Sequence, residues 1–179
     1  AATALSACQP DSGGDLHPVA SAGIRIEDRK IAVLTDGAVE ARVTARWSDT
    51  GSNSMVIRYH NGGTTTVKIP VKAIHMRHAI GEAYVRTVID RTGVDMMDNR
   101  EDNDQGKTLF SLNGEADGGG QGSGVLEVPA GATREIDAFL TSFANEGRVA
   151  AGDRVTATIP LAGRNVEVAF TARAPSLLP

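Results

Sequence analysis

The sequence predicts an all-β fold, an antiparallel β-sandwich of about eight or nine strands. Short runs of residues alternate between apolar and polar side chains, which is the period of a half-buried strand. Turn residues separate these runs at intervals of about 8–12 residues, and no long helical segment is indicated. The chain has 179 residues, of which 41% are hydrophobic and 4% aromatic, so we expect one domain with an aliphatic core.

The first two extended pieces are predicted at Ile24–Ile26 and Lys30–Thr35, joined by a charged kink at residues 27–29. The second piece ends at the turn signal Asp36-Gly37. This piece has few charged residues of the kind that prevent an edge strand from pairing with another chain. We therefore expect an interaction edge here that contacts a partner or a second copy. The apolar residues of this edge are Ile31, Val33 and Leu34.

The clearest strand is predicted at residues 39–47, where the alternation is regular. One face carries Val39, Ala41, Val43, Ala45 and Trp47, and the other carries Glu40, Arg42, Thr44 and Arg46. This pattern indicates a half-buried strand with its charges in solvent. Trp47, the single tryptophan, is the expected aromatic residue of the core.

The remaining strands are predicted at residues 55–60, 64–76, 83–90, 108–112, 125–128 and 134–143, and in two runs around Ala162-Gly163. Residues 61–63, Asn-Gly-Gly, indicate a hairpin. Pro70 cannot donate a ladder hydrogen bond, so it places its segment on an edge or at a break between two strands. The apolar spacing of residues 134–143 also fits a helix, but the turns on either side favour a strand.

The C-terminal part, an extended run after "PAGAT" followed by two strands around "AGD" and "LAGRN", resembles the immunoglobulin-like accessory domains of bacterial envelope proteins. This resemblance implies an immunoglobulin-like β-sandwich. It is a resemblance of strand pattern, since the cysteine pair of antibody domains is absent.

The N-terminal segment "LSAC", residues 5–8, resembles the lipobox of bacterial lipoproteins. The resemblance implies a chain cut before Cys8, acyl groups such as palmitate on that thiol, and, from the uncharged Gln9, an outer-membrane location. Residues 1–7 are then the end of a signal peptide and residues 8–22 a flexible tether rich in Gly, Ser, Pro and Asp. The sandwich is expected over residues 23–175, with a short tail at 176–179.

Composition argues against two classes of partner. The formal net charge is −4 and the basic residues are dispersed, which argues against nucleic-acid binding. No apolar run has the length of about 20 residues that a membrane-spanning helix requires.

Two groups of residues are candidate metal ligands. His75, Met76 and His78 are of the types that copper prefers, although residues 75 and 78 point to opposite faces of a regular strand. The acidic run "DMMDNREDND" supplies Asp98, Asp102 and Asp104 as candidate calcium ligands, but it does not align with the calcium-loop pattern. A solvated acidic loop and two histidines without a ligand are the alternatives.

No catalytic signature is present. "QGKT", residues 105–108, lacks the first glycine of a phosphate-binding loop, and no serine lies in a G-x-S-x-G motif. We therefore expect a non-enzymatic, lipid-anchored envelope protein, without cofactor, that binds other proteins. The alternatives are a periplasmic metal carrier that uses His75, Met76 and His78, and a subunit of an extracellular assembly built by sheet-edge pairing.

Protein isolated from native membranes is expected to carry acyl mass on Cys8 and to lack residues 1–7, as intact-mass spectrometry can measure. Cys8→Ser should release the domain from the membrane, because stable anchoring takes two or more acyl chains or signals. An unmodified product that begins at Ala1 would rule out the lipobox.

Overall fold

The structure, a computed structural model, describes residues 13–48, 53–93, 106–112, 122–143 and 149–174. The strands of the first half are β1 (Gly13–Pro18), β2 (Ile24–Glu27), β3 (Ile31–Asp36), β4 (Val39–Ser48), β5 (Asn53–Asn61) and β6 (Val67–Ile69). After a 3₁₀ turn, η1 (Val71–Ala73), come β7 (His75–His78), β8 (Gly81–Asp90), β9 (Lys107–Ser111), β10 (Leu126–Val128), β11 (Thr133–Leu140), β12 (Arg154–Pro160) and β13 (Asn165–Ala172). The all-β prediction is confirmed.

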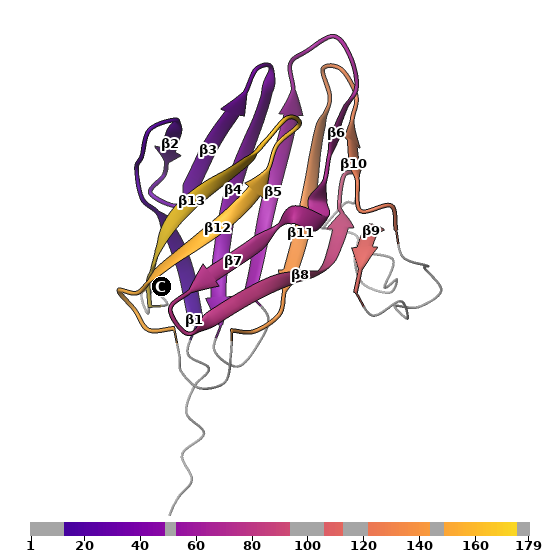
Figure 1. Cartoon of the computed structure of the whole chain (residues 1–179). Coiled ribbons are helices and arrows are strands. Elements are labelled where there is room, and N and C mark those ends of the chain that lie inside the picture. Colours follow the sequence, from indigo (N-terminus) through magenta and orange to yellow (C-terminus); the bar gives the residue numbers. More distant parts are fainter. Residues whose placement is uncertain (1–12, 49–52, 94–105, 113–121, 144–148, 175–179) are drawn as a thin grey trace, which may run out of the picture.

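Eight antiparallel strands form a closed barrel, so the predicted immunoglobulin-like sandwich is wrong (Figure 1). The strand order is β1–β13–β12–β7–β8–β11–β5–β4, and β4 pairs back with β1. A sandwich and a filled barrel both require alternating strands with one buried face, so alternation does not distinguish them. Closure depends on which strands pair at the ends of the sheet, and that is not a local property of the sequence.

The closing strand is β1, which lies inside the predicted tether at residues 8–22. Its residues 13–16 pair with residues 45–48 of β4, and residues 16–18 pair with β13. Leu16 is fully buried in the barrel. The tether prediction is therefore wrong for residues 13–18. Their Gly, Asp and Pro residues are typical of a loop, but the segment forms a paired strand.

One edge of the ten-residue strand β4 pairs with two different strands. Residues 39–43 pair with β3, and residues 45–48 pair with β1. The predicted alternation is confirmed, because the five apolar residues from Val39 to Trp47 are all buried. The β2–β3 hairpin thus extends the wall of the barrel beyond the end of β1 (Figure 1).

Side chains fill the barrel, as is usual for eight strands. Tyr59 is fully buried, and its hydroxyl donates a hydrogen bond of 2.8 Å to the Pro160 carbonyl oxygen. Burial raises the pKa of Tyr59 far above its ordinary value. Other large interior residues are Leu16, Met55, Ile57, Met76, Ile136, Leu140 and Phe170.

A two-stranded ribbon of β6 and β10 packs against the barrel and buries Ile69, Leu126 and Val128 in the common core. Asn61, at the end of β5, holds this ribbon: its amide donates to the carbonyl oxygens of Val128 (2.9 Å) and Thr65 (2.8 Å). The hairpin predicted at residues 61–63 is thus wrong, because β6 pairs with β10 and not with β5.

Two ambiguous segments are resolved. Pro70 lies at a break, between β6 and η1, as one of the two alternatives predicted. Residues 133–140 form a strand, β11, which pairs with β5 on one side and β8 on the other, so the strand assignment is confirmed.

Trp47→Ala is expected to lower the free energy of unfolding by about 3–5 kcal/mol, because the ring is only 5% exposed and its removal leaves a cavity. Urea denaturation followed by circular dichroism measures the change without using the lost indole. Arg46→Ala is the matched control, since its side chain is 70% exposed and its loss should change stability little. Near-wild-type stability of Trp47→Ala would contradict the inward position of the ring.

Candidate functional site

Two of the predicted sites lie outside the described residues. These are the lipidation site Cys8 and the candidate calcium ligands Asp98, Asp102 and Asp104.

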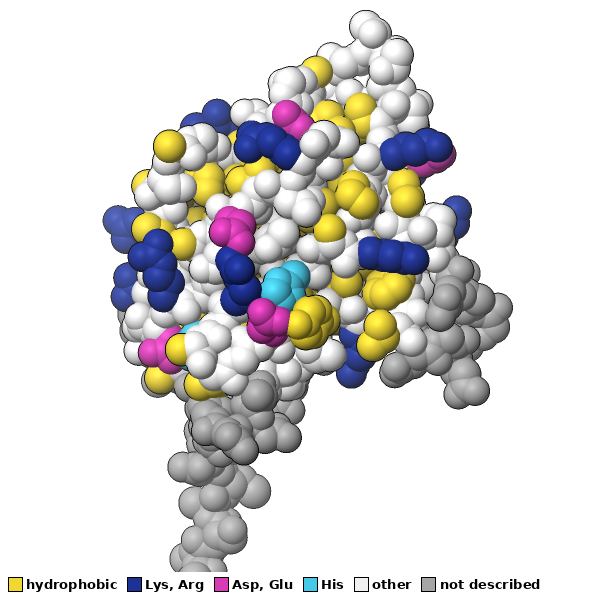
Figure 2. All heavy atoms as spheres, in the orientation of Figure 1, with side chains coloured by type: hydrophobic (Ala, Val, Ile, Leu, Met, Phe, Trp, Pro, Cys, Tyr) yellow, Lys and Arg dark blue, Asp and Glu magenta, His cyan; other side chains and the backbone are white. Residues whose placement is uncertain are grey.

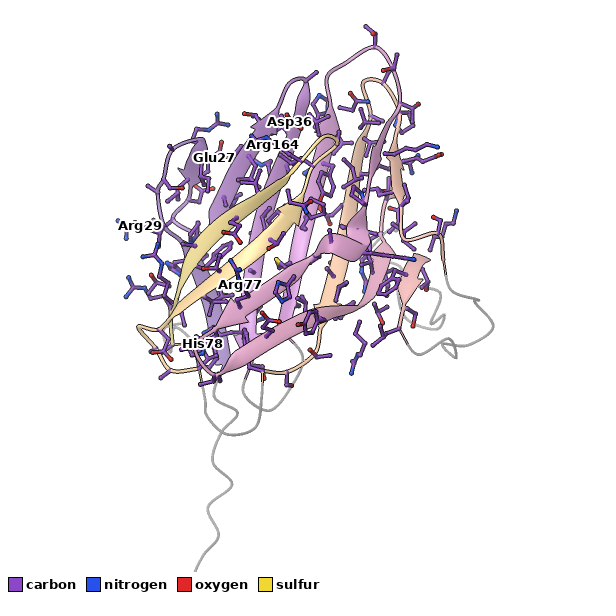
Figure 3. The ribbon with its side chains drawn as sticks, viewed as in Figure 1. Glu27, Arg29, Asp36, Arg77, His78 and Arg164 are labelled. Carbon is purple, nitrogen blue, oxygen red and sulfur yellow. The ribbon has the colours of Figure 1, made fainter. Side chains whose placement is uncertain are left out.

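The candidate copper ligands His75, Met76 and His78 do not converge. Met76 is fully buried inside the barrel, whereas His75 lies on the outer face of β7, where its ring packs on Tyr84 at a centroid distance of 4.8 Å. His78 lies at the end of β7 (Figure 3). Its ring packs against that of Phe143 at a centroid distance of 5.7 Å. Within the described ranges, no three His, Cys, Asp or Glu side chains gather as metal ligands. The three-residue copper site is therefore wrong, because alternation along β7 places His75 on the face opposite to Met76 and His78.

The two histidines have separate carboxylate neighbours. The His78 ring accepts a hydrogen bond at Nδ1 from the Ile80 amide, and its Nε2 lies 3.1 Å from Asp153 Oδ2. His75 Nε2 lies 3.6 Å from Glu82 Oε2. The Tyr84 hydroxyl donates to Glu82, which lowers the pKa of Glu82 and raises that of Tyr84. The His75–Glu82–Tyr84 contacts lie on the outer face of β7 and β8, whereas the His78 side chain is nearly buried at the end of β7, so the two groups form no common site.

The predicted apolar interaction edge is not exposed. Leu34 is 1% and Val33 2% exposed, and Ile31 is half-buried. Val33 faces outward between Arg25 of β2 and Arg42 of β4, and Arg42 reaches across β3 to an ion pair with Glu27. Charged side chains cover Val33, Leu34 faces the core, and β3 is paired on both sides, so the edge prediction is wrong at Val33 and Leu34.

A cleft of about 440 Å³ lies between the β6–β10 ribbon and the barrel. Its volume is in the range of pockets that take small ligands. Leu109 of β9 and Val125 and Leu126 beside and within β10 give it an apolar lining. Five charged residues from five strands complete the lining: Lys68, Asp90, Lys107, Glu127 and Arg134.

No strand pairing within the described part of the chain spans this cleft, although residues 122–124 lie against the free side of β9. Among the described residues, β9 pairs only with β8 and β10 only with β6. One hydrogen bond of 2.6 Å, from the Gly124 amide to the Leu109 carbonyl oxygen, links the two sides. The register of β8 and β9 shifts between Val88 and Ile89, an irregularity of the type that often adjoins binding sites. The strands β9 and β10 therefore border the cleft, and among the described residues each of them has a strand partner on one side only.

The charges in the cleft favour an anion. Lys68 Nζ lies 3.6 Å from Glu127 Oε1, and Arg134 Nη1 lies 3.9 Å from Asp90 Oδ2. Arg134 Nε is buried and has no hydrogen-bond partner among the described residues. A buried donor without a partner is costly, and a carboxylate is the acceptor that fits a guanidinium best. Lys107 adds a third cation opposite Asp90.

Sequence reasoning did not find this cleft. Its charged residues come from five strands, and no motif connects them along the chain. Only the pairing of the ribbon and the course of β8, β9 and β11 bring them together.

The chain matches no protein-family model, no curated protein and no solved structure with which it was compared. In the part of the chain described, no helix has the length and apolar character to cross a membrane.

Proposed function

We propose that this chain is a non-enzymatic, lipid-anchored protein of a bacterial envelope whose cleft binds an acidic peptide segment of a partner protein. The observation that carries the proposal is the convergence of Lys68, Lys107 and Arg134 on a cleft that β10 borders with only one strand partner, β6, among the described residues. The filled barrel serves as a rigid support.

An extended peptide fits both properties of the cleft. The side of β10 without a strand partner could recognise a peptide backbone, and apolar side chains of the peptide could contact Leu109, Val125 and Leu126. An acidic side chain of the peptide would meet Arg134, whose buried Nε lacks a partner among the described residues. The two carboxylates of the cleft, Asp90 and Glu127, favour a peptide with few acidic groups over a polyanion, since they repel additional negative charge.

The proposed anchor at Cys8 would hold the barrel close to the membrane. Only residues 9–12 separate Cys8 from Gly13, where β1 begins. Five Cα–Cα steps span at most about 18 Å, far less than a fifteen-residue tether. The register places Gly13 opposite Ser48 of β4, while Arg134 lies opposite Tyr59, near the other end of β5. The cleft would therefore lie at the end of the barrel that is remote from the membrane.

Isothermal titration with a short capped peptide that carries a single Glu between Val residues tests the cleft. We expect saturable binding to the whole chain that weakens at least tenfold in Arg134→Gln, because a charge-assisted hydrogen bond contributes about 1.5–3 kcal/mol. A peptide with Gln in place of Glu should bind more weakly than the acidic peptide.

Arg77→Gln is the matched control, since Arg77 lies on the outer face of β7, pairs with Glu167 and does not line the cleft. This variant should bind the acidic peptide like the wild-type chain. Equal loss of binding in both variants, or no binding of the acidic peptide by the wild-type chain, would contradict the proposal.

A further inference from the structure

Five cationic residues gather around β1 although the whole chain has a formal net charge of −4. We call this group the β1 patch; its members, all exposed, are Arg29, Lys30, Arg46, Arg154 and Arg173. They come from the β2–β3 turn, β4, β12 and the end of β13. Figure 3 shows Arg29 at the margin of the molecule, and Figure 2 shows Lys and Arg side chains gathered along the same margin.

Asp15 and His17, on the outer face of β1, lie at the centre of the patch. Lys30 Nζ lies 2.7 Å and Arg46 Nε 3.8 Å from the Asp15 carboxylate. Burial lowers the pKa of His17, and the positive charge of Arg173 lowers it further, with Lys30 and Arg29 acting in the same direction. Thr171 lies between His17 and Arg154 in the register of β1, β13 and β12. The cations surround the Asp15 carboxylate, and Asp28 and Asp153 precede Arg29 and Arg154 in the chain. Arg29 and Arg173 form no ion pair with a carboxylate within the described ranges.

Arg29 is held in a backbone conformation that opposes its residue type. Asp28 and Arg29 have φ angles of 49° and 60°, and the Lys30 amide donates to the Glu27 carbonyl oxygen at 3.1 Å. This is the geometry of a type I′ turn, in which Asn-Gly is favoured. A bulky residue in this conformation is strained, because its Cβ atom lies too close to the backbone. The turn therefore presents a cation at a position where glycine would relieve strain.

We infer that the β1 patch binds the anionic headgroups of a phospholipid membrane. The inference extends the proposed anchoring at Cys8, because β1 begins within a few residues of that cysteine. Cations near an anionic bilayer add attraction that falls off within about 10 Å at moderate salt, the screening length. The patch would hold the side of the barrel that contains β1 against the membrane surface.

Vesicle sedimentation of the full chain carrying Cys8→Ser, which removes any lipid anchor, tests the patch by itself. We expect binding to phosphatidylcholine vesicles that contain phosphatidylglycerol, little binding to phosphatidylcholine alone, and loss of binding as salt rises. Adding Arg29→Gly and Arg173→Ser should weaken partitioning on the order of twentyfold, since each cation contributes roughly fivefold. Arg29→Gly also relieves the strained turn, so the variant tests binding without depending on a weakened fold.

Arg58→Ser with Arg77→Ser is the matched control, because it removes the same charge from exposed positions outside the patch. The inference would be overturned if both pairs of substitutions weakened vesicle binding equally, or if the protein did not prefer vesicles that contain phosphatidylglycerol. Binding of the acidic Glu–Val peptide at the patch in place of vesicles would also overturn it and assign the patch to a protein partner. Lipidation of Cys8 is measured separately by mass, so failure of the patch and failure of the anchor are distinguishable.

Discussion

The close packing of β1 between β4 and β13 is the constraint on which the barrel depends. Gly14 lies opposite Trp47 of β4, and a Cβ atom at this position would be 2.0 Å from the Arg173 carbonyl oxygen. That oxygen belongs to the backbone and cannot move away as a side-chain atom could. Only glycine therefore allows β1 to lie this close to the end of β13. Without β1, residues 45–48 of β4 and the end of β13 would be open edges, and the interior around Leu16 would be exposed.

The same closure separates the two surfaces to which we assign functions. The β1 patch surrounds the strand that closes the barrel, whereas the cleft lies where the β6–β10 ribbon meets β9 and the start of β11. Asn61 holds the ribbon in place and so sets one wall of the cleft. An anchored barrel would thereby present Arg134 away from the membrane while Arg29 and Arg173 face the headgroups.

Local chemistry allowed much of the strand pattern to be predicted. The alternation from Val39 to Trp47 and the strand at residues 133–140 follow from side-chain period and flanking turns, which are properties of short segments. Closure could not be predicted, because Gly13 and Gly14 have the composition of a linker and their role is visible only beside Trp47 and Arg173. The cleft could not be predicted either, since Lys68, Lys107 and Arg134 are distant in sequence. Val33 was misassigned because the cover supplied by Arg42 and Glu27 comes from neighbouring strands.

Native-state hydrogen exchange in the wild-type chain and in Gly14→Ala tests the closure most directly. The amides of Val19 and Arg173 donate to Ala169 and Asp15, so they report on β1 alone. We expect them to be as protected in the wild type as the Ala172 amide, which donates to Asp153, and to lose protection in Gly14→Ala. In the control Gly163→Ala, where a Cβ would meet only the Asp36 carboxylate at 3.2 Å, both should stay protected. Exchange of the Val19 and Arg173 amides at the rate of an unstructured peptide in the wild type would contradict a barrel closed by β1.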